Sequence, residues 1–194
     1  CAMIQLFNGM QSSLSMVYDR EMGNMRTMLM SPLPRWFVLV SKLAAGAAVS
    51  VAQVYAYLLI AYFWEIEPPT WRGYLTVLPA LVLVGLMLGA LGMLLSSLIK
   101  QLENFAGVMN FVIFPMFFAS SALYPLWRVR ESSPLLYRVC EFNPFTYAVE
   151  FIRFSFYGKF DALSFAVVTG CALVFLCGAI LAYDPARGVL AMRG

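Results

Sequence analysis

The sequence predicts an all-α membrane protein whose 194 residues form a single transmembrane domain with about five spans. Apolar residues make up 62% of the chain and charged residues 12%, whereas soluble domains contain about 45–50% and about 25%. The apolar residues gather in runs of about twenty, the length of helix that crosses a hydrocarbon core of about 30 Å. The formal net charge of +3 is small, so it gives no indication of nucleic-acid binding.

The residue types that usually carry metal and acid–base chemistry are scarce. The sequence contains no histidine, which is the commonest metal ligand and the usual general base. Its four cysteines do not follow metal-binding spacing. We therefore expect no catalytic residue, no metal and no cofactor bound by this chain. A membrane enzyme remains a weaker alternative, for which the candidate groups are Cys140, Glu141, Glu150, Ser155 and Asp161.

The first predicted span, residues 1–17, is unusually polar. Gln5, Asn8 and Ser12 follow helical spacing, so they share one face of the helix. A polar face inside a membrane turns toward protein or toward a polar path. The pattern leaves two interpretations open: these side chains line a pathway, or they form hydrogen bonds between helices.

A short charged segment, about residues 19–31, follows this span. Methionines and a leucine recur at three- and four-residue spacing after the charged residues, which predicts a short amphipathic helix at the membrane surface. Pro32 and Pro34 end it, because proline disfavours helical geometry in the residue before it and has no N–H to donate. Such a helix would transmit a push to both neighbouring spans. The alternative is a polar loop whose apolar face rests on lipid headgroups.

The remaining spans are predicted from apolar runs. They are residues 36–64, 74–99, 105–124 and 162–183. In the second of these four, Gly85, Gly89 and Gly92 form a small-residue face that favours close helix packing. Pro115 is expected to kink the third.

Residues 125–160 mix arginines, glutamates and aromatic residues, which predicts two short helices in or near the membrane interface. Asn143 and Pro144 suit the N-cap and first helical position, and Gly158 suits the stop. Glu150 and Arg153 are three residues apart on one helix face, either as a structural ion pair or as part of a gate.

Basic residues predict the orientation. If the spans alternate, seven basic residues lie on the side of segment 19–31, and one lies on the other side once the amphipathic 125–160 region is left out. The positive-inside rule then places segment 19–31 in the cytoplasm.

Two motifs resemble the permease subunit of ABC-2 type ABC transporters. Asp19-Arg20-Glu21-Met22-Gly23, followed by Met28-Leu29-Met30-Ser31-Pro32 and Lys42, is similar to the family pattern between its second and third spans. Asn143-Pro144-Phe145-Thr146-Tyr147 with Arg153 is similar to the signature before the last span. The layout matches the second to sixth spans, so a first span is expected before Cys1. Asn24-Met25-Arg26 departs from the threonine and acidic residue of many members.

The resemblance implies an exporter subunit in the bacterial cytoplasmic membrane that works as a homodimer or heterodimer with two ABC ATPase subunits. Segment 19–31 would be the coupling helix, and 125–160 a re-entrant helix pair closing the outer side. The implied ATPase-coupling residues are Asp19, Arg20, Glu21, Met22, Met25, Arg26 and Leu29. The implied outer-gate residues are Asn143, Pro144, Tyr147, Glu150 and Arg153, and the pathway-lining candidates are Gln5, Asn8 and Ser12. ATP and magnesium would bind the partner, since this chain has no phosphate-binding loop.

Two other functions stay open at this stage. An ion-gradient-driven secondary transporter would need ionisable residues in mid-span, and the predicted spans carry almost none beyond Lys42. A non-catalytic membrane assembly subunit is the other. The aromatic residues around 142–157 suit an amphiphilic substrate and membrane anchoring equally.

Overall fold

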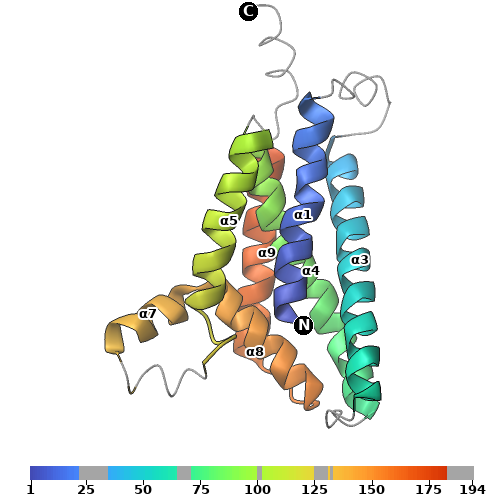
Figure 1. Ribbon diagram of the computed structural model, residues 1–194, viewed down its shortest axis with the longest axis vertical. Coiled ribbons are helices and arrows are strands. Elements are labelled where there is room, and N and C mark those ends of the chain that lie inside the picture. Colours follow the sequence, from blue (N-terminus) through green and yellow to red (C-terminus); the bar gives the residue numbers. More distant parts are fainter. Residues whose placement is uncertain (22–34, 65–70, 100–101, 125–130, 132, 183–194) are drawn as a thin grey trace, which may run out of the picture.

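The computed structural model describes residues 1–21, 35–64, 71–99, 102–124, 131 and 133–182. Within these ranges the chain forms helices and no strands. The helices are α1 (Ala2–Glu21), α3 (Arg35–Phe63), α4 (Trp71–Leu98), α5 (Leu102–Phe118), α7 (Pro134–Phe142), α8 (Pro144–Phe156) and α9 (Ala162–Ala182). The long helices run roughly side by side, and α7 and α8 lie across one end of them (Figure 1).

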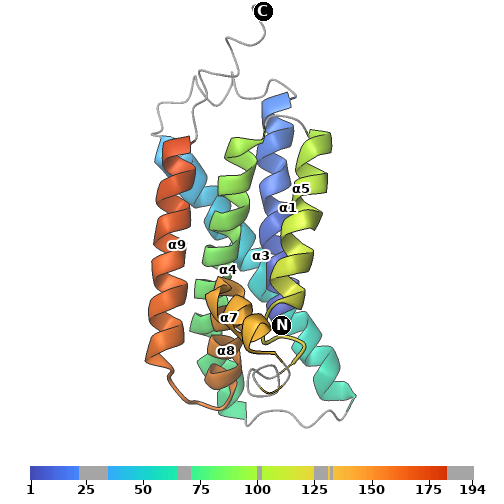
Figure 2. The ribbon, with the colours of Figure 1, turned by 90° about the vertical axis from the view of Figure 1, so that its left-hand side faces the viewer.

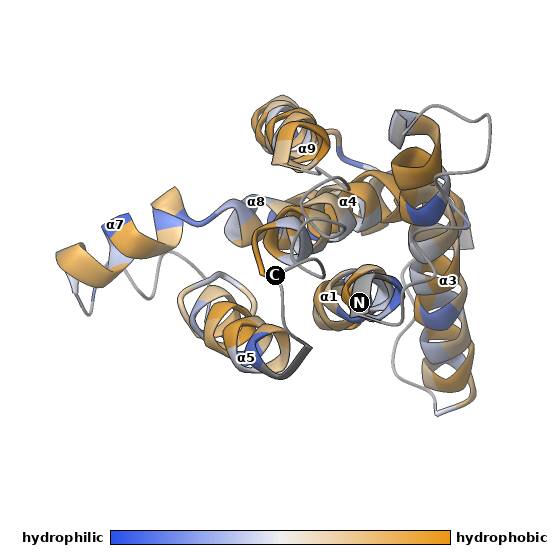
Figure 3. Ribbon diagram, turned by 90° about the horizontal axis from the view of Figure 1, so that it is seen from above, coloured by the Kyte–Doolittle hydropathy of each residue, from blue (hydrophilic) through white to orange (hydrophobic). Residues whose placement is uncertain are grey.

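Helix α4 is the centre of the bundle. It packs against α1, α3, α8 and α9, and Figure 3 shows it between α9 and α1. The small-residue face predicted on α4 makes the contacts with α1 and α3. A Cβ on Gly85 would lie 2.8 Å from Gln5 Oε1, and one on Gly92 would lie 2.8 Å from the backbone oxygen of Gly9. The backbones of α1 and α4 therefore approach more closely than any larger residue would permit.

Among the residues that the structure describes, three helices are long and apolar enough to cross a membrane: Trp36–Phe63, Arg72–Leu98 and Ala162–Ala182. Their positions agree with three of the predicted spans. Helix α1 is 20 residues long but too polar to qualify, and the apolar part of α5, Asn104–Phe118, is shorter. Five spans are therefore not confirmed by helix length and composition.

The predicted span 105–124 needs a correction, because helix α5 ends at Phe118 and the chain continues as turns to Tyr124. The early end has a physical reason. Pro115 removes one helical donor, and Asn143 from α8 occupies the carbonyls of Met116 and Ala119. The predicted boundary between the first span and segment 19–31 also moves, because α1 continues unbroken through Asp19 to Glu21.

The helix ends group as the alternation of spans predicts. The end of α1, the start of α3, the end of α4, the start of α5 and the end of α9 lie at one end of the bundle, which we call the Glu21 end (Figure 1). Helices α7 and α8 lie at the opposite end, the α8 end. Helices α9 and α5 stand on opposite sides of α4 (Figure 2).

The two helices predicted within 125–160 are present as α7 and α8. Asn143 caps α8, with its side-chain oxygen accepting from the backbone N–H of Phe145, and Pro144 is the first helical residue. Gly158 follows the helix with φ +65°, a left-handed conformation that glycine adopts without strain, and its N–H donates to the carbonyl of Ser155. Both the predicted start and the predicted stop are confirmed.

Candidate functional site

A groove lined by polar and small apolar residues runs between α1 and α3 toward the Glu21 end. It has a volume of about 460 Å³ and is partly open. Its lining comes from α1 and α3: Asn8, Gln11, Ser12 and Ser15, and Lys42, Ala45, Gly46, Val49 and Gln53. Gly46 brings the helices together, since a Cβ there would lie 2.8 Å from the Ser12 hydroxyl oxygen. Of the three pathway-lining candidates, Asn8 and Ser12 therefore face one groove.

Gln5, the third pathway-lining candidate, lies elsewhere. Its side chain is completely buried against α4, and its amide nitrogen donates to the backbone carbonyl of Leu81 at 3.1 Å. Its amide oxygen has no hydrogen-bond partner and rests against Gly85. Gln5 thus follows the alternative interpretation of the polar face, hydrogen bonding between helices. Ser13 is likewise turned toward a neighbouring helix, since it is buried against Gly92 of α4.

Two helix-to-helix polar contacts border the groove. The amide of Asn8 donates to the side-chain oxygen of Gln53 on α3. Nearer the Glu21 end, the ammonium of Lys42 forms an ion pair with the carboxylate of Asp19 on α1. Lys42 therefore bonds across to α1, at the point where α1 is about to end and α3 has just begun. This pair ties together the two helices that flank residues 22–34.

The predicted coupling residues fall into two groups. Asp19, Arg20 and Glu21 form the last turn of α1, and Asp19 is the partner of Lys42. The other four, Met22, Met25, Arg26 and Leu29, lie outside the described residues, as does the rest of the predicted coupling helix up to residue 31.

Asn143 joins α5 to α8 at the opposite end of the bundle. Its amide nitrogen donates to the carbonyls of Met116 at 2.8 Å and Ala119 at 2.7 Å, while its oxygen caps α8. Thr146 donates to the carbonyl of Cys140 at 2.7 Å, which fixes the end of α7 to the first turn of α8. The Asn-Pro-Phe-Thr motif is thus a junction of three helices.

The other predicted outer-gate residues lie on α8 but do not act as one unit. Arg153 donates to the backbone carbonyl of Ser121 at 3.2 Å, and the structure contains no ion pair between Arg153 and Glu150. The ion pair predicted from their spacing is therefore absent, because Arg153 turns toward the chain after α5. Burial raises the pKa of Glu150, nearby Arg153 opposes this rise, and Asp161 adds to it.

Burial also raises the pKa of Tyr147, and the negative charges of Glu141 and Glu150 add to the rise. The same cause raises the pKa of Cys140, so its thiol is less ionised than a free one and is a poorer nucleophile. No group of three or more cysteines, aspartates or glutamates is arranged to hold a metal within the described residues.

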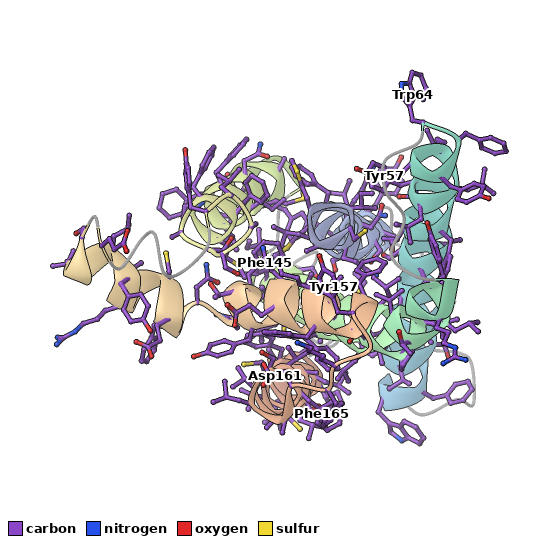
Figure 4. All side chains as sticks on the ribbon, turned by 90° about the horizontal axis from the view of Figure 1, so that it is seen from below. Tyr57, Trp64, Phe145, Tyr157, Asp161 and Phe165 are labelled. Carbon is purple, nitrogen blue, oxygen red and sulfur yellow. The ribbon has the colours of Figure 1, made fainter. Side chains whose placement is uncertain are left out.

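Aromatic residues mark the α8 end and the start of α9. Phe145 is buried beside α5, with its ring centroid 6.5 Å from that of Phe117. Trp64, by contrast, projects beyond the end of α3 and has 77% of its surface exposed (Figure 4). Asp161 caps α9 by accepting from the N–H groups of Leu163 and Ser164. Exposed aromatic rings at helix ends are typical of membrane interfaces.

Sequence reasoning missed Gln53 and Ser121. Gln53 is the single side-chain amide in the predicted span 36–64, and that isolation is a signal that it has a polar partner. Ser121 gave no such signal, because its backbone carbonyl, not its side chain, receives Arg153.

The comparisons with known proteins agree with this architecture. The family model described as "ABC-2 type transporter" matches residues 1–157, which include α1 to α8. The chain belongs to the ABC-2 type transporter family. The match takes in both the Asp19–Lys42 pair and the Asn143 junction.

Several relatives carry transport names. The chain is 29% identical over 147 residues to a putative transport permease ycf38 of Cyanophora paradoxa, which covers 75% of this chain and 49% of that protein. It is 31% identical over 103 residues to a probable multidrug ABC transporter permease YbhR of Escherichia coli K12, which covers 53% of this chain and 28% of the relative. The chain thus spans about half the length, or less, of these relatives. No solved structure matches this ABC-2 chain.

The family match and the names of these relatives point in one direction, since the family is described as a transporter and the relatives are named as transport permeases. Subunits of this kind generally work with separate ABC ATPases and lack a nucleotide-binding domain of their own. The motifs that suggested the family from sequence are now explained in part by structure, as an ion pair between helices and a three-helix junction.

Proposed function

We propose that this chain forms the pathway of an ATP-driven exporter in the bacterial cytoplasmic membrane. It pairs with itself or with a homologous permease, and two ABC ATPases bind its Glu21 end. The family match supports this assignment, and the observation that carries it is the ion pair between Asp19 and Lys42. That pair lies where force from a partner on segment 19–31 would enter the bundle.

The proposed coupling step uses the Asp19–Lys42 pair. ATP binding closes the ATPases, and their movement displaces segment 19–31, with Glu21 and Arg26 meeting charged groups and Met22, Met25 and Leu29 filling an apolar groove. Because α1 and α3 are joined by Asp19 and Lys42, a displacement of the end of α1 moves both helices together. The groove between them changes shape as they tilt.

The Asn143 junction is the outer gate in this proposal. It bonds α5, α7 and α8 into one unit at the end opposite the ATPases. Arg153 adds a further bond to the chain that follows α5. Because these bonds join α5, α7 and α8, the three helices would move together as a rigid body. Such a body suits a gate that opens only when the long helices tilt.

The test is charge reversal at the coupling end. Glu21→Lys, reconstituted with the ATPase partner in liposomes, is expected to hydrolyse ATP while transport falls at least about tenfold, because the ATPase contact carries the wrong sign. Glu141→Lys, the same change on exposed α7 at the α8 end, is the matched control and retains coupling. Both variants insert normally, as checked by membrane fractionation.

Normal transport by Glu21→Lys would disprove the coupling assignment. Transport that persists after ATP depletion and stops with a protonophore would instead establish an ion-gradient-driven transporter. The orientation is tested separately by labelling a cysteine introduced at Met25 from each side of the membrane.

A further inference from the structure

The groove between α1 and α3 exposes polar groups within a membrane-spanning helix. From Lys42 to Gln53 the lining of α3 extends about 16 Å along the axis, at 1.5 Å per residue. Both residues lie inside Trp36–Phe63, the apolar stretch long enough to cross the membrane. Polar groups at this depth are unfavourable against lipid tails, whereas most of the surface of the groove is apolar, so the groove suits an occupant with both a polar and an apolar part.

The unused hydrogen-bonding groups define the chemistry of that occupant. The contact between Asn8 and Gln53 uses one donor and one acceptor, which leaves the oxygen of Asn8 and the amide nitrogen of Gln53. The amide of Gln11 makes no hydrogen bond within the described part of the chain. The groove therefore offers both donors and acceptors.

The charge in the groove is balanced. Lys42 is the only ionisable residue among the lining side chains, and its ammonium is paired with the carboxylate of Asp19. An anionic group in the groove would have to compete with Asp19, and a cationic group would meet an ammonium. The electrostatics thus favour a head group that carries hydrogen-bonding atoms but no net charge.

The shape also favours a small ligand over a packed helix. The groove is concave, with a volume of about 460 Å³ in the range of small-molecule sites. The space beside Gly46 is already occupied by the Ser12 side chain of α1. Gly46 therefore offers no flat surface against which a third helix could pack. By contrast, a Cβ on Gly92 of α4 would lie 2.8 Å from the backbone oxygen of Gly9 on α1.

We propose that this groove binds an amphiphile with an uncharged head group rich in hydroxyl or amide groups, while its tail lies in the surrounding lipid. Asn8, Gln11 and Gln53 recognise the head, and Gln53 is the new specificity-determining residue. The proposal rests on the export function proposed above, since it names the class of substrate that enters the pathway. Binding, however, does not require ATP or the ATPase.

The experiment measures binding of a defined probe, radiolabelled dodecyl β-glucoside, to the full chain in nanodiscs without nucleotide. Gln53→Leu and Asn8→Leu are each expected to weaken binding at least about fivefold, because each removes hydrogen bonds from a low-dielectric site. Asn110→Leu is the matched control, since it removes an exposed amide from α5, outside the groove, and leaves binding unchanged. Dodecyl phosphocholine, with the same tail and a zwitterionic head that has two full charges and no hydrogen-bond donor, competes at least about tenfold less well.

Equal binding by Gln53→Leu and the unaltered chain would overturn the proposal, as would equal competition by both head groups. A benzophenone amino acid at Ala45 gives a second readout. Labelling of the glucoside supports the site, whereas efficient cross-linking to a second copy with no glucoside labelling would mean that protein covers the groove. If the unaltered chain binds the glucoside but, together with the ATPases and ATP, does not transport it, only the proposed export function is refuted.

Discussion

Helices α4 and α9 are both apolar spans of similar hydropathy, yet they occupy opposite environments. In the most apolar stretch of α4, 61% of residues are buried in the bundle, compared with 11% in α9. Both contain glycines. A Cβ on Gly85, Gly89 or Gly92 of α4 would lie within 2.8 Å of another helix, whereas a Cβ on Gly178 of α9 would lie 3.1 Å from the Leu94 side chain and one on Gly170 would have no neighbour within 4 Å. The closeness of these glycine contacts, rather than hydropathy, therefore distinguishes the central helix from the peripheral one. The reason is that lipid is as apolar as a helix surface, so close packing decides which helices associate.

The most severe test of this difference is to add one methyl group to each helix. Gly92→Ala is expected to lower the free energy of unfolding by about 1–3 kcal/mol, because its Cβ would lie 2.4 Å from the Ser13 hydroxyl oxygen and 2.8 Å from the Gly9 carbonyl oxygen. Gly170→Ala makes the same change in open space and is expected to be neutral or to stabilise by up to about 1 kcal/mol through helix propensity. Unfolding of the purified chain by sodium dodecyl sulfate, followed by circular dichroism, measures both. Equal effects would contradict the distinction between the two helices.

The second test concerns α8, which packs on both α4 and α9. Asn143→Ala is expected to destabilise the α8 end by about 2 kcal/mol, because it removes the cap of α8 and two bonds to carbonyls at the end of α5. Hydrogen exchange of α5 and α8 should accelerate, while the α1–α4 contact stays protected. Ser133→Ala is the control, since its cap contact to the N–H of Leu136 is 3.5 Å long, and its loss is expected to cost less than about 1 kcal/mol. A larger effect at Ser133 would invalidate the role given to Asn143.

A third test asks whether α9 depends on its N-cap, Asp161. Asp161→Ala removes the N-cap bonds to Leu163 and Ser164, with an expected loss of about 1 kcal/mol confined to the first turns of α9. Asp161→Asn keeps a capping oxygen and is expected to retain most of the stability. Hydrogen exchange of residues 162–168 provides the measurement. No change in Asp161→Ala would mean that packing on α4 and α8 holds α9 without the cap.

The smallest expected effect is a pH dependence at Glu150, on the helix between α4 and α9. Burial raises the pKa of this carboxyl in the folded state, so the fold favours the protonated form. Its contribution to stability is therefore greatest below the ordinary glutamate pKa of about 4.3 and is lost as the pH rises through the higher folded-state pKa. Glu150→Gln, which stays neutral, should have a slightly higher melting temperature than the unaltered chain at pH 7 and an equal one near pH 4. A constant difference at both pH values would exclude this ionisation as the cause.

Sequence reasoning succeeded for the two ends of α8 and failed for the partner of one of its side chains. The start and stop of α8 were predicted because Asn143, Pro144 and Gly158 act through local backbone geometry. The ion pair between Glu150 and Arg153 was predicted from the same local spacing and is absent, because Arg153 finds a carbonyl 32 residues earlier in the chain. Local signals settle helix ends but do not choose between partners in space.

The sequence by itself determined the all-helical membrane class, the family and the small-residue face of α4, because these depend on composition, motifs and helical periodicity. Only the tertiary structure decided that Gln5 is buried against Leu81 while Asn8 faces a groove with Gln53, and that Lys42 bonds to Asp19. The physical reason is that a polar face on one helix has no fixed partner until the neighbouring helices are placed. In this chain the glycines of α4 fix that placement.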